Sequence, residues 1–229
     1  PTGADTLFTQ STDGLTVNKL LPCGMDLKFK YDVDSEYKFK VVKEMTETTP
    51  SFLERVMLRD KIYQDTDSDD IPDLITETVT VNGNITALEN NTLQSQKTIT
   101  SPQGRTVTTL YDPDTLLTTS LTIPGLHDTN YGYDTRGMLT SINTNTRETT
   151  FTYNTEGFLA SITDPEDYTT TYNYDPVGRM TGISRPDGSS LGFTYDNNGN
   201  MTVLTNPSTI DHGFGYNLVN LNDAYQTPL

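Results

Sequence analysis

Tyrosines at a nearly constant interval constrain the fold of this chain more than any other feature. Successive copies lie 20 to 22 residues apart, and four units share the order aromatic, any residue, Tyr, Asp or Asn, two variable residues, Gly. The repeat tyrosines are Tyr111, Tyr133, Tyr153, Tyr174, Tyr195 and Tyr216. A fixed period of this length is typical of an array of small structural modules.

The residue types of one unit predict a strand, a tight turn and a returning strand. Two aromatic residues separated by one position project from the same face of a strand. Asp or Asn after the tyrosine can bond its own backbone, and the glycine allows a positive φ. Second turns are predicted at Asp164–Asp167, Arg185–Gly188 and Asn206–Pro207. Because one hairpin cannot bury its aromatic face alone, the predicted class is all-β, with antiparallel β-hairpin repeats forming a rolled sheet or a partial shell.

Apolar residues follow each predicted turn at two fixed offsets, three residues apart. We expect them to be core positions, although strict alternation would place such residues on opposite faces. The spacing therefore predicts a bulge, or a change of sheet face, in the returning strand. The first offset holds Leu139, Leu159, Met180 and Met201, and the second holds Ile142, Ile162, Ile183 and Leu204.

The N-terminal region departs from the period, and we place a soft boundary near residue 98. Residues 1–97 form a β-rich region and residues 98–229 a repeat array with five modules and a partial sixth. Leu27–Tyr31 and Tyr37–Val41 alternate cleanly and predict a hairpin. Phe29–Asp32 looks like a degenerate copy of the repeat. Only Thr48–Lys61 has a pattern that allows a helical turn or two.

An acidic loop at residues 65–73 is the main candidate for site chemistry. Carboxylates at positions 1, 3, 5 and 9 of a tight loop can converge on a hard cation, for which calcium is the natural candidate. Zinc would require His or Cys. Asp70 and Thr76 stand where an EF-hand requires Gly and Glu, so the loop is not an EF-hand. A solvated acidic turn is the alternative. The predicted ligands are Asp65, Asp67, Asp69 and Asp73.

Charge and composition argue against several function classes. The net charge of −16 repels nucleic acid and anionic membranes, and the sequence has no apolar run long enough for a membrane span. Cys23 with His127 or His212 has no local signature of a nucleophile and base, so we predict no catalytic residues and no enzymatic activity.

Residues 172–188 resemble the YD repeat of the Rhs proteins almost residue for residue, and the resemblance extends over about residues 100 to 225. It implies a β-sheet strip that spirals into a hollow shell, as in the cocoon of bacterial Tc toxins, the Rhs effectors and the teneurins. In those families the shell encloses a toxic domain or presents adhesion surfaces. The acidic loop resembles the calcium loops of integrin α-chain repeats. These resemblances imply a secreted or cell-surface bacterial protein, of which we expect this chain to be a segment.

The sequence therefore favours a non-enzymatic structural scaffold stabilised by calcium. One alternative is a calcium-dependent adhesion or carbohydrate-binding module, and another is a fragment of a toxin-encapsulating shell. Expected partners are neighbouring repeats or other copies of the chain, with glycans or an encapsulated toxin domain as further possibilities. An exposed aromatic ladder would favour glycan binding, and inward-facing rings would favour the scaffold. The rings in question are Tyr131, Phe151, Tyr172 and Phe193.

Overall fold

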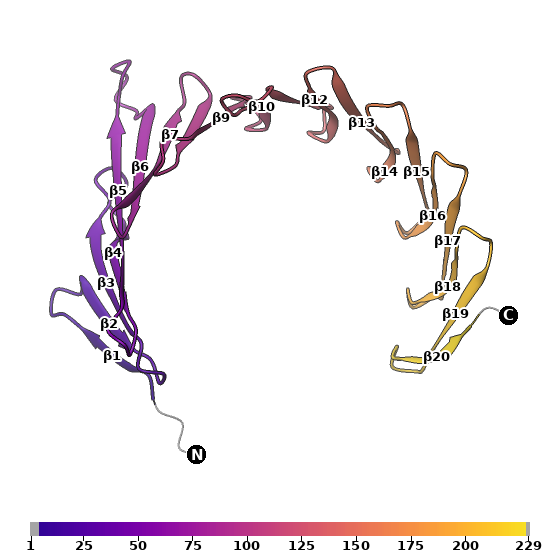
Figure 1. The fold of residues 1–229 in the computed structure, drawn as a ribbon, viewed down its shortest axis with the longest axis horizontal. Helices are drawn as coiled ribbons and strands as arrows, with labels where there is room; N and C mark the ends of the chain where they lie inside the picture. Colours follow the sequence, from indigo (N-terminus) through magenta and orange to yellow (C-terminus); the bar gives the residue numbers. More distant parts are fainter. Residues whose placement is uncertain (1–4, 228–229) are drawn as a thin grey trace. The chain divides into compact units, whose positions relative to one another are not determined.

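The computed structural model describes residues 5–227, and these residues form strands and turns without any helix (Figure 1). They divide into two compact units, Pro1–Asp128 and Thr129–Leu229. The described part of the chain therefore contains no helix that could cross a membrane. The all-β prediction is confirmed. The boundary near residue 98 falls within one strand, Gln96–Thr100, and stays a prediction about where the repeat pattern starts.

The first unit is an antiparallel meander in which each strand pairs with its neighbours in sequence. Its strands within residues 5–128 are β1 (Leu7–Gln10), β2 (Thr16–Leu20), β3 (Asp26–Val33), β4 (Lys40–Thr48), β5 (Glu54–Gln64), β6 (Leu74–Val81), β7 (Asn84–Asn91), β8 (Gln96–Thr100), β9 (Thr106–Tyr111) and β10 (Thr118–Thr122).

The second unit repeats this arrangement with shorter and more uniform strands. Within residues 129–227 they are β11 (Thr129–Tyr133), β12 (Leu139–Thr144), β13 (Arg147–Tyr153), β14 (Leu159–Thr163), β15 (Thr169–Tyr174), β16 (Met180–Ser184), β17 (Ser190–Tyr195), β18 (Met201–Thr205), β19 (Asp211–Tyr216) and β20 (Asn222–Gln226).

The predicted bulge in the returning strand is confirmed. Tyr131 lies opposite Ile142, but Tyr133 lies opposite Leu139, so Thr140 is an extra residue on the returning strand. The bulge brings two apolar residues, three apart in sequence, opposite two aromatic residues that are two apart. The same shift occurs in every later module of the second unit. The extra residues there are Ala160, Thr181, Thr202 and Asp223.

The prediction that the apolar residues after each turn are core positions is wrong. Within residues 5–227, strands contact only their sequence neighbours, so each unit is a single layer of sheet. A single layer has no second layer to cover its apolar face. As a result, no apolar side chain of the described residues is fully buried, and the predicted core residues are half-buried.

The predicted turn chemistry is confirmed. The repeat glycines Gly137, Gly157, Gly178 and Gly199 have φ values of 78°, 92°, 87° and 90°. The second turns form where Pro and Asp or Asn predicted them, with Asp167, Gly188 and Thr209 at positive φ.

The helical turns considered for Thr48–Lys61 do not form. β4 and β5 pair across this segment, and the turn between them is closed by a 2.9 Å bond from the Thr49 N–H to the Leu53 carbonyl. Phe52 occupies the left-handed region at φ 60°, which interrupts a right-handed helix. Cross-strand pairing has overridden a weak helical pattern.

The predicted N-terminal hairpin is confirmed, with its second strand starting at Lys40 rather than Tyr37. The difference arises because residues 34–39 form the turn, closed by a 2.9 Å bond from the Asp34 N–H to the Phe39 carbonyl. The Phe29–Asp32 segment lies opposite a bulge like that of the repeats, since Lys30 pairs with Glu44 and Tyr31 with Val42, which leaves Lys43 of β4 as the extra residue.

Candidate metal centre

Three of the four predicted ligands come together in the loop between β5 and β6. Asp65, Asp67 and Asp73 each offer a carboxylate oxygen, and these oxygens lie within 4.8 Å of one another. Asp65 and Asp67 are exposed, whereas Asp73 is buried. Asp69 lies outside this group, and its carboxylate accepts a 2.9 Å bond from the Ile71 N–H. The loop therefore directs three carboxylates toward one point.

Asp73 is the anchor of the loop. Its side chain accepts bonds from the Thr66 N–H at 2.8 Å and the Thr66 hydroxyl at 2.7 Å. The Asp73 N–H donates a 3.0 Å hydrogen bond to the Gln64 carbonyl, and the Asp73 carbonyl accepts a 2.8 Å hydrogen bond from the Thr92 N–H. These two bonds connect the loop to β5 and to the turn after β7. Asp73 and Asp34, at 4% and 6% exposure, are the two buried residues of residues 5–227.

Main-chain N–H groups hold the Asp65 carboxylate in place at the exposed end of the loop. The carboxylate of Asp65 accepts the Ser68 N–H at 2.6 Å and the Asp70 N–H at 2.9 Å. Ser68 and Asp70 both have φ of 68°, so the chain bends through the left-handed region at these two positions. Asp70 adopts this conformation where similar loops use Gly, and Asp tolerates it better than most residues.

The electrostatics of the two exposed ligands differ. Partial desolvation raises the pKa of Asp67 above its ordinary value, and repulsion from Asp69, Asp73 and Asp65 adds to the effect. Partial desolvation also acts on Asp65, but N–H donors from Asp70 and Ser68 outweigh it and lower its pKa. The ionised form of Asp67 is therefore disfavoured in the folded loop. A bound cation would relieve the repulsion between Asp67 and the neighbouring carboxylates.

The chemistry of this donor set fits a hard cation with oxygen ligands. Carboxylate oxygens suit calcium or magnesium, and a calcium ion would require further oxygens from the main chain or from water. Thr66 and Thr92, which hold Asp73 in place, were not predicted from the sequence. Nothing in their local sequence distinguishes them from the many other threonines of the strands and turns.

The residues considered for nucleophilic chemistry occupy ordinary positions. Cys23 is exposed in the turn between β2 and β3. His212 lies on β19, where its Nδ1 is 2.7 Å from the Tyr225 hydroxyl on β20 and the two rings are stacked. This pair links neighbouring strands.

In two modules of the second unit, the residue after the repeat glycine contacts the next module. The Phe158 ring stacks on Tyr174 with centroids 5.1 Å apart. The Arg179 guanidinium donates hydrogen bonds to the Asp175 carboxylate at 2.7 Å and to the Asp196 carbonyl at 2.8 Å. It also lies over the Tyr195 ring. These contacts join successive turns side by side.

Comparison with known protein families identifies the family to which this repeat array belongs. The family model described as the teneurin YD-shell matches residues 24–228. The chain belongs to the teneurin YD-shell family. It is a structural segment of a YD shell. The match reaches well upstream of residue 100 and so includes most of the N-terminal region, where the repeat motif is barely visible in the sequence. No curated protein matches the chain.

Solved structures of Tc toxin complexes are similar in fold to this chain. A structure of the Photorhabdus luminescens Tc holotoxin pore with a TccC3 mutation matches 96% of this chain with a TM-score of 0.51 and 14% identity. The crystal structure of TcdB2-TccC3-Cdc42 matches 97% of it with a TM-score of 0.50 and 13% identity. In both cases the chain spans 15% of the length of the matched protein.

Proposed function

We propose that this chain is a non-enzymatic wall segment of a secreted or cell-surface bacterial YD-shell protein, and that a calcium ion bound by the β5–β6 loop stabilises it. The observation that supports this most strongly is the single-layer architecture of each unit. Among the described residues, strands contact only sequence neighbours and no apolar side chain is fully buried. Such a sheet suits a wall that is continued by further repeats of a longer chain.

The calcium part of the proposal is based on the β5–β6 loop. Asp65, Asp67 and Asp73 bring three negative charges within 4.8 Å in an already acidic chain. At neutral pH their repulsion opposes the folded loop, and an oxygen-binding cation would convert it into attraction. Asp69 remains part of the proposed ligand set, because its exposed side chain lies on the same loop as the other three.

The experiment that tests calcium stabilisation is thermal unfolding in calcium and in excess EGTA. A ligand that binds only the folded state raises the melting temperature by mass action. We expect a lower melting temperature in EGTA, restored by calcium and not by an equal concentration of magnesium. Identical melting curves in calcium and EGTA would remove calcium from the proposal and leave the shell assignment unchanged.

A segment of a toxin-encapsulating shell is the second candidate. It is favoured by the match to structures of Tc toxin complexes, which cover nearly all of this chain. In that case the full-length protein carries a further domain that the shell encloses. Limited proteolysis of the full-length protein tests this, because an enclosed domain is cleaved only after the shell has been unfolded.

The adhesion alternative receives less support from the repeat aromatics. Tyr131, Phe151, Tyr172 and Phe193 are all half-buried, so they form neither a fully exposed ladder nor a buried seam. Each lies opposite a half-buried aliphatic residue of the next strand, so part of each ring is covered.

A further inference from the structure

A pocket of the first unit opens where two neighbouring strands separate. β4 and β5 pair from Thr48 and Glu54 as far as Glu44 and Leu58, whereas β5 continues to Gln64 in its pairing with β6. The end of β4 near the β3–β4 turn therefore has no main-chain pairing with β5. A pocket of about 270 Å³ lies between them, lined by residues 32–35, 39, 41–43 and 59–61.

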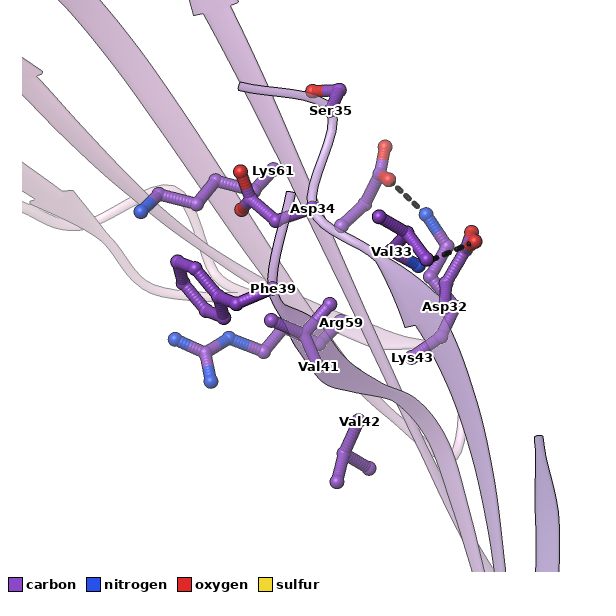
Figure 2. A pocket seen from close by; sticks show the side chains of 11 residues that line it. Asp32, Val33, Asp34, Ser35, Phe39, Val41, Val42, Lys43, Arg59 and Lys61 are labelled. Atoms are coloured by element: carbon purple, nitrogen blue, oxygen red, sulfur yellow. Dashed lines mark hydrogen bonds and ion pairs between the residues drawn. The ribbon is translucent and has the colours of Figure 1, made fainter. Parts of the chain in front are cut away.

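One wall of the pocket is aromatic. Phe39 is 53% exposed and contributes its ring to the lining, and Figure 2 shows the Lys61 and Arg59 side chains extending past it. The Tyr37 ring is 60% exposed and is stacked at 22° to Phe39, with centroids 6.4 Å apart, so the aromatic surface continues beyond the pocket. The face of an aromatic ring carries negative charge density and attracts weakly positive C–H groups.

The polar lining is balanced in charge. The lining contains three cations, Lys43, Arg59 and Lys61, and three carboxylates, Asp32, Asp34 and Asp60. This balance, in a chain of net charge −16, favours neither an anionic nor a cationic ligand.

Two of the cations keep donors available for a ligand. Lys43 is already paired with Asp60, and Arg59 uses its Nε for a 2.7 Å bond to Glu77. The Lys61 ammonium lies over the Tyr63 ring, 4.9 Å from its centroid, and forms no ion pair with the described carboxylates. The Nη groups of Arg59 and the ammonium of Lys61 are therefore the donors that a ligand can reach.

We propose that this pocket is a saccharide site that holds one neutral pyranose ring of a glycan. A pyranose has an apolar C–H face that stacks on Phe39, and it has hydroxyls that accept bonds from Lys61 and Arg59. Charge-assisted bonds of this kind orient the ring. The pocket is smaller than the usual ligand site of roughly 300–1,000 Å³, which fits a single ring, while Tyr37 supports the next ring of the glycan.

Saturation-transfer NMR on the whole chain tests the site, with maltotriose, cellotriose and chitotriose as neutral probes. Sialyllactose and free phenylalanine serve as the anionic and zwitterionic probes. We expect transfer to at least one neutral trisaccharide, and binding at least about tenfold weaker in Phe39→Ala, as for loss of an aromatic anchor. Lys61→Met should weaken binding severalfold and provides a second variant if Phe39→Ala does not fold.

The matched control is Phe52→Ala. Phe52 is 87% exposed on the turn between β4 and β5 and does not line the pocket, so its loss should leave binding unchanged. Absence of transfer to all three neutral sugars would overturn the proposal. So would binding only of sialyllactose or phenylalanine, or an equal loss of binding in Phe39→Ala and Phe52→Ala.

Discussion

The hydroxyl of Tyr195 donates a 2.7 Å hydrogen bond to the main-chain carbonyl of Met180, at the start of the preceding strand. Tyr153 makes the same bond to Leu139 at 2.9 Å. In both cases the tyrosine before the turn of one module is bonded to the returning strand of the module before it. The repeat tyrosine thus contributes to the contact between modules as well as to its own hairpin.

Removal of this hydroxyl should destabilise the second unit. Tyr195→Phe keeps the ring and deletes a half-buried hydrogen bond, which costs about 0.5–1.5 kcal/mol of the free energy of unfolding. Urea titration followed by circular dichroism measures the change. Tyr172→Phe is the matched control, because the structure gives the Tyr172 hydroxyl no hydrogen bond within residues 5–227, and it should change stability little. Equal losses of stability in both variants would show that the hydrogen bond to the Met180 carbonyl does not stabilise the second unit.

Gly178 should be the least replaceable of the repeat glycines. It has φ of 87°, and a Cβ added there would lie 2.5 Å from the Phe158 ring. Gly199 has φ of 90° but open space around the added Cβ. Both Ala variants suffer left-handed strain of about 1–2 kcal/mol. Gly178→Ala should lose more, at the lower end of the roughly 1–3 kcal/mol typical of overpacking, because the Phe158 ring is partly exposed and can move. Chemical denaturation of the two variants measures this difference, and equal losses would contradict the packing of Phe158 against the turn.

The aspartates of the repeat turns should make the second unit acid-sensitive. Hydrogen bonds from the Met138 N–H, which has the largest effect, and from the Arg136 N–H lower the pKa of the Asp134 carboxyl. Partial desolvation opposes this shift without cancelling it. A group whose folded-state pKa is lowered contributes stability above its ordinary pKa of 3.8 and loses it as the pH falls through the folded-state value. We expect the melting temperature to fall on acidification below about pH 5.

Asp134→Asn tests this origin of acid sensitivity. Asn154 and Asn217 already occupy the same position in other modules and accept the same main-chain donors. The variant should therefore be nearly neutral at pH 7 apart from an exposed ion pair with Arg136, and its loss of stability between pH 5 and pH 3 should be smaller than that of the wild type. An unchanged pH profile would assign the acid sensitivity to other groups.

Asp67→Asn should separate the repulsion in the β5–β6 loop from calcium binding. The raised pKa of Asp67 means that its contribution to apo stability is present below pH 3.8 and is lost as the pH rises through the raised value. In EGTA at pH 7 the variant should therefore melt higher than the wild type, and added calcium should raise its melting temperature less. A full calcium shift in Asp67→Asn would exclude Asp67 as a ligand. Asp69→Asn tests in the same way whether the fourth predicted carboxylate takes part.

Local sequence predicted much of the module but not the burial of its side chains. The offset between Leu139 and Ile142 predicted the bulge, because only an extra residue lets both face aromatic partners. The same residues suggested a core that does not form, since a single strand cannot indicate whether a second layer covers it. The burial of Asp34 was also missed, because its partner is the Tyr63 hydroxyl, 29 positions away.

For the acidic loop, spacing predicted which carboxylates could converge, and the backbone decided which of them do. Asp65, Asp67 and Asp73 meet, whereas Asp69 bonds the Ile71 N–H within the turn. That distinction depends on φ at Ser68 and Asp70, which the residue types alone do not specify.

Hydrogen exchange of Gly178→Ala against the wild type tests most directly whether each strand depends on its sequence neighbours alone. If it does, amide exchange should become faster in β14 to β18, around the altered turn, and should remain unchanged in β2 to β8. An equal acceleration across both units would contradict the account, because it would show that the chain unfolds as one cooperative body.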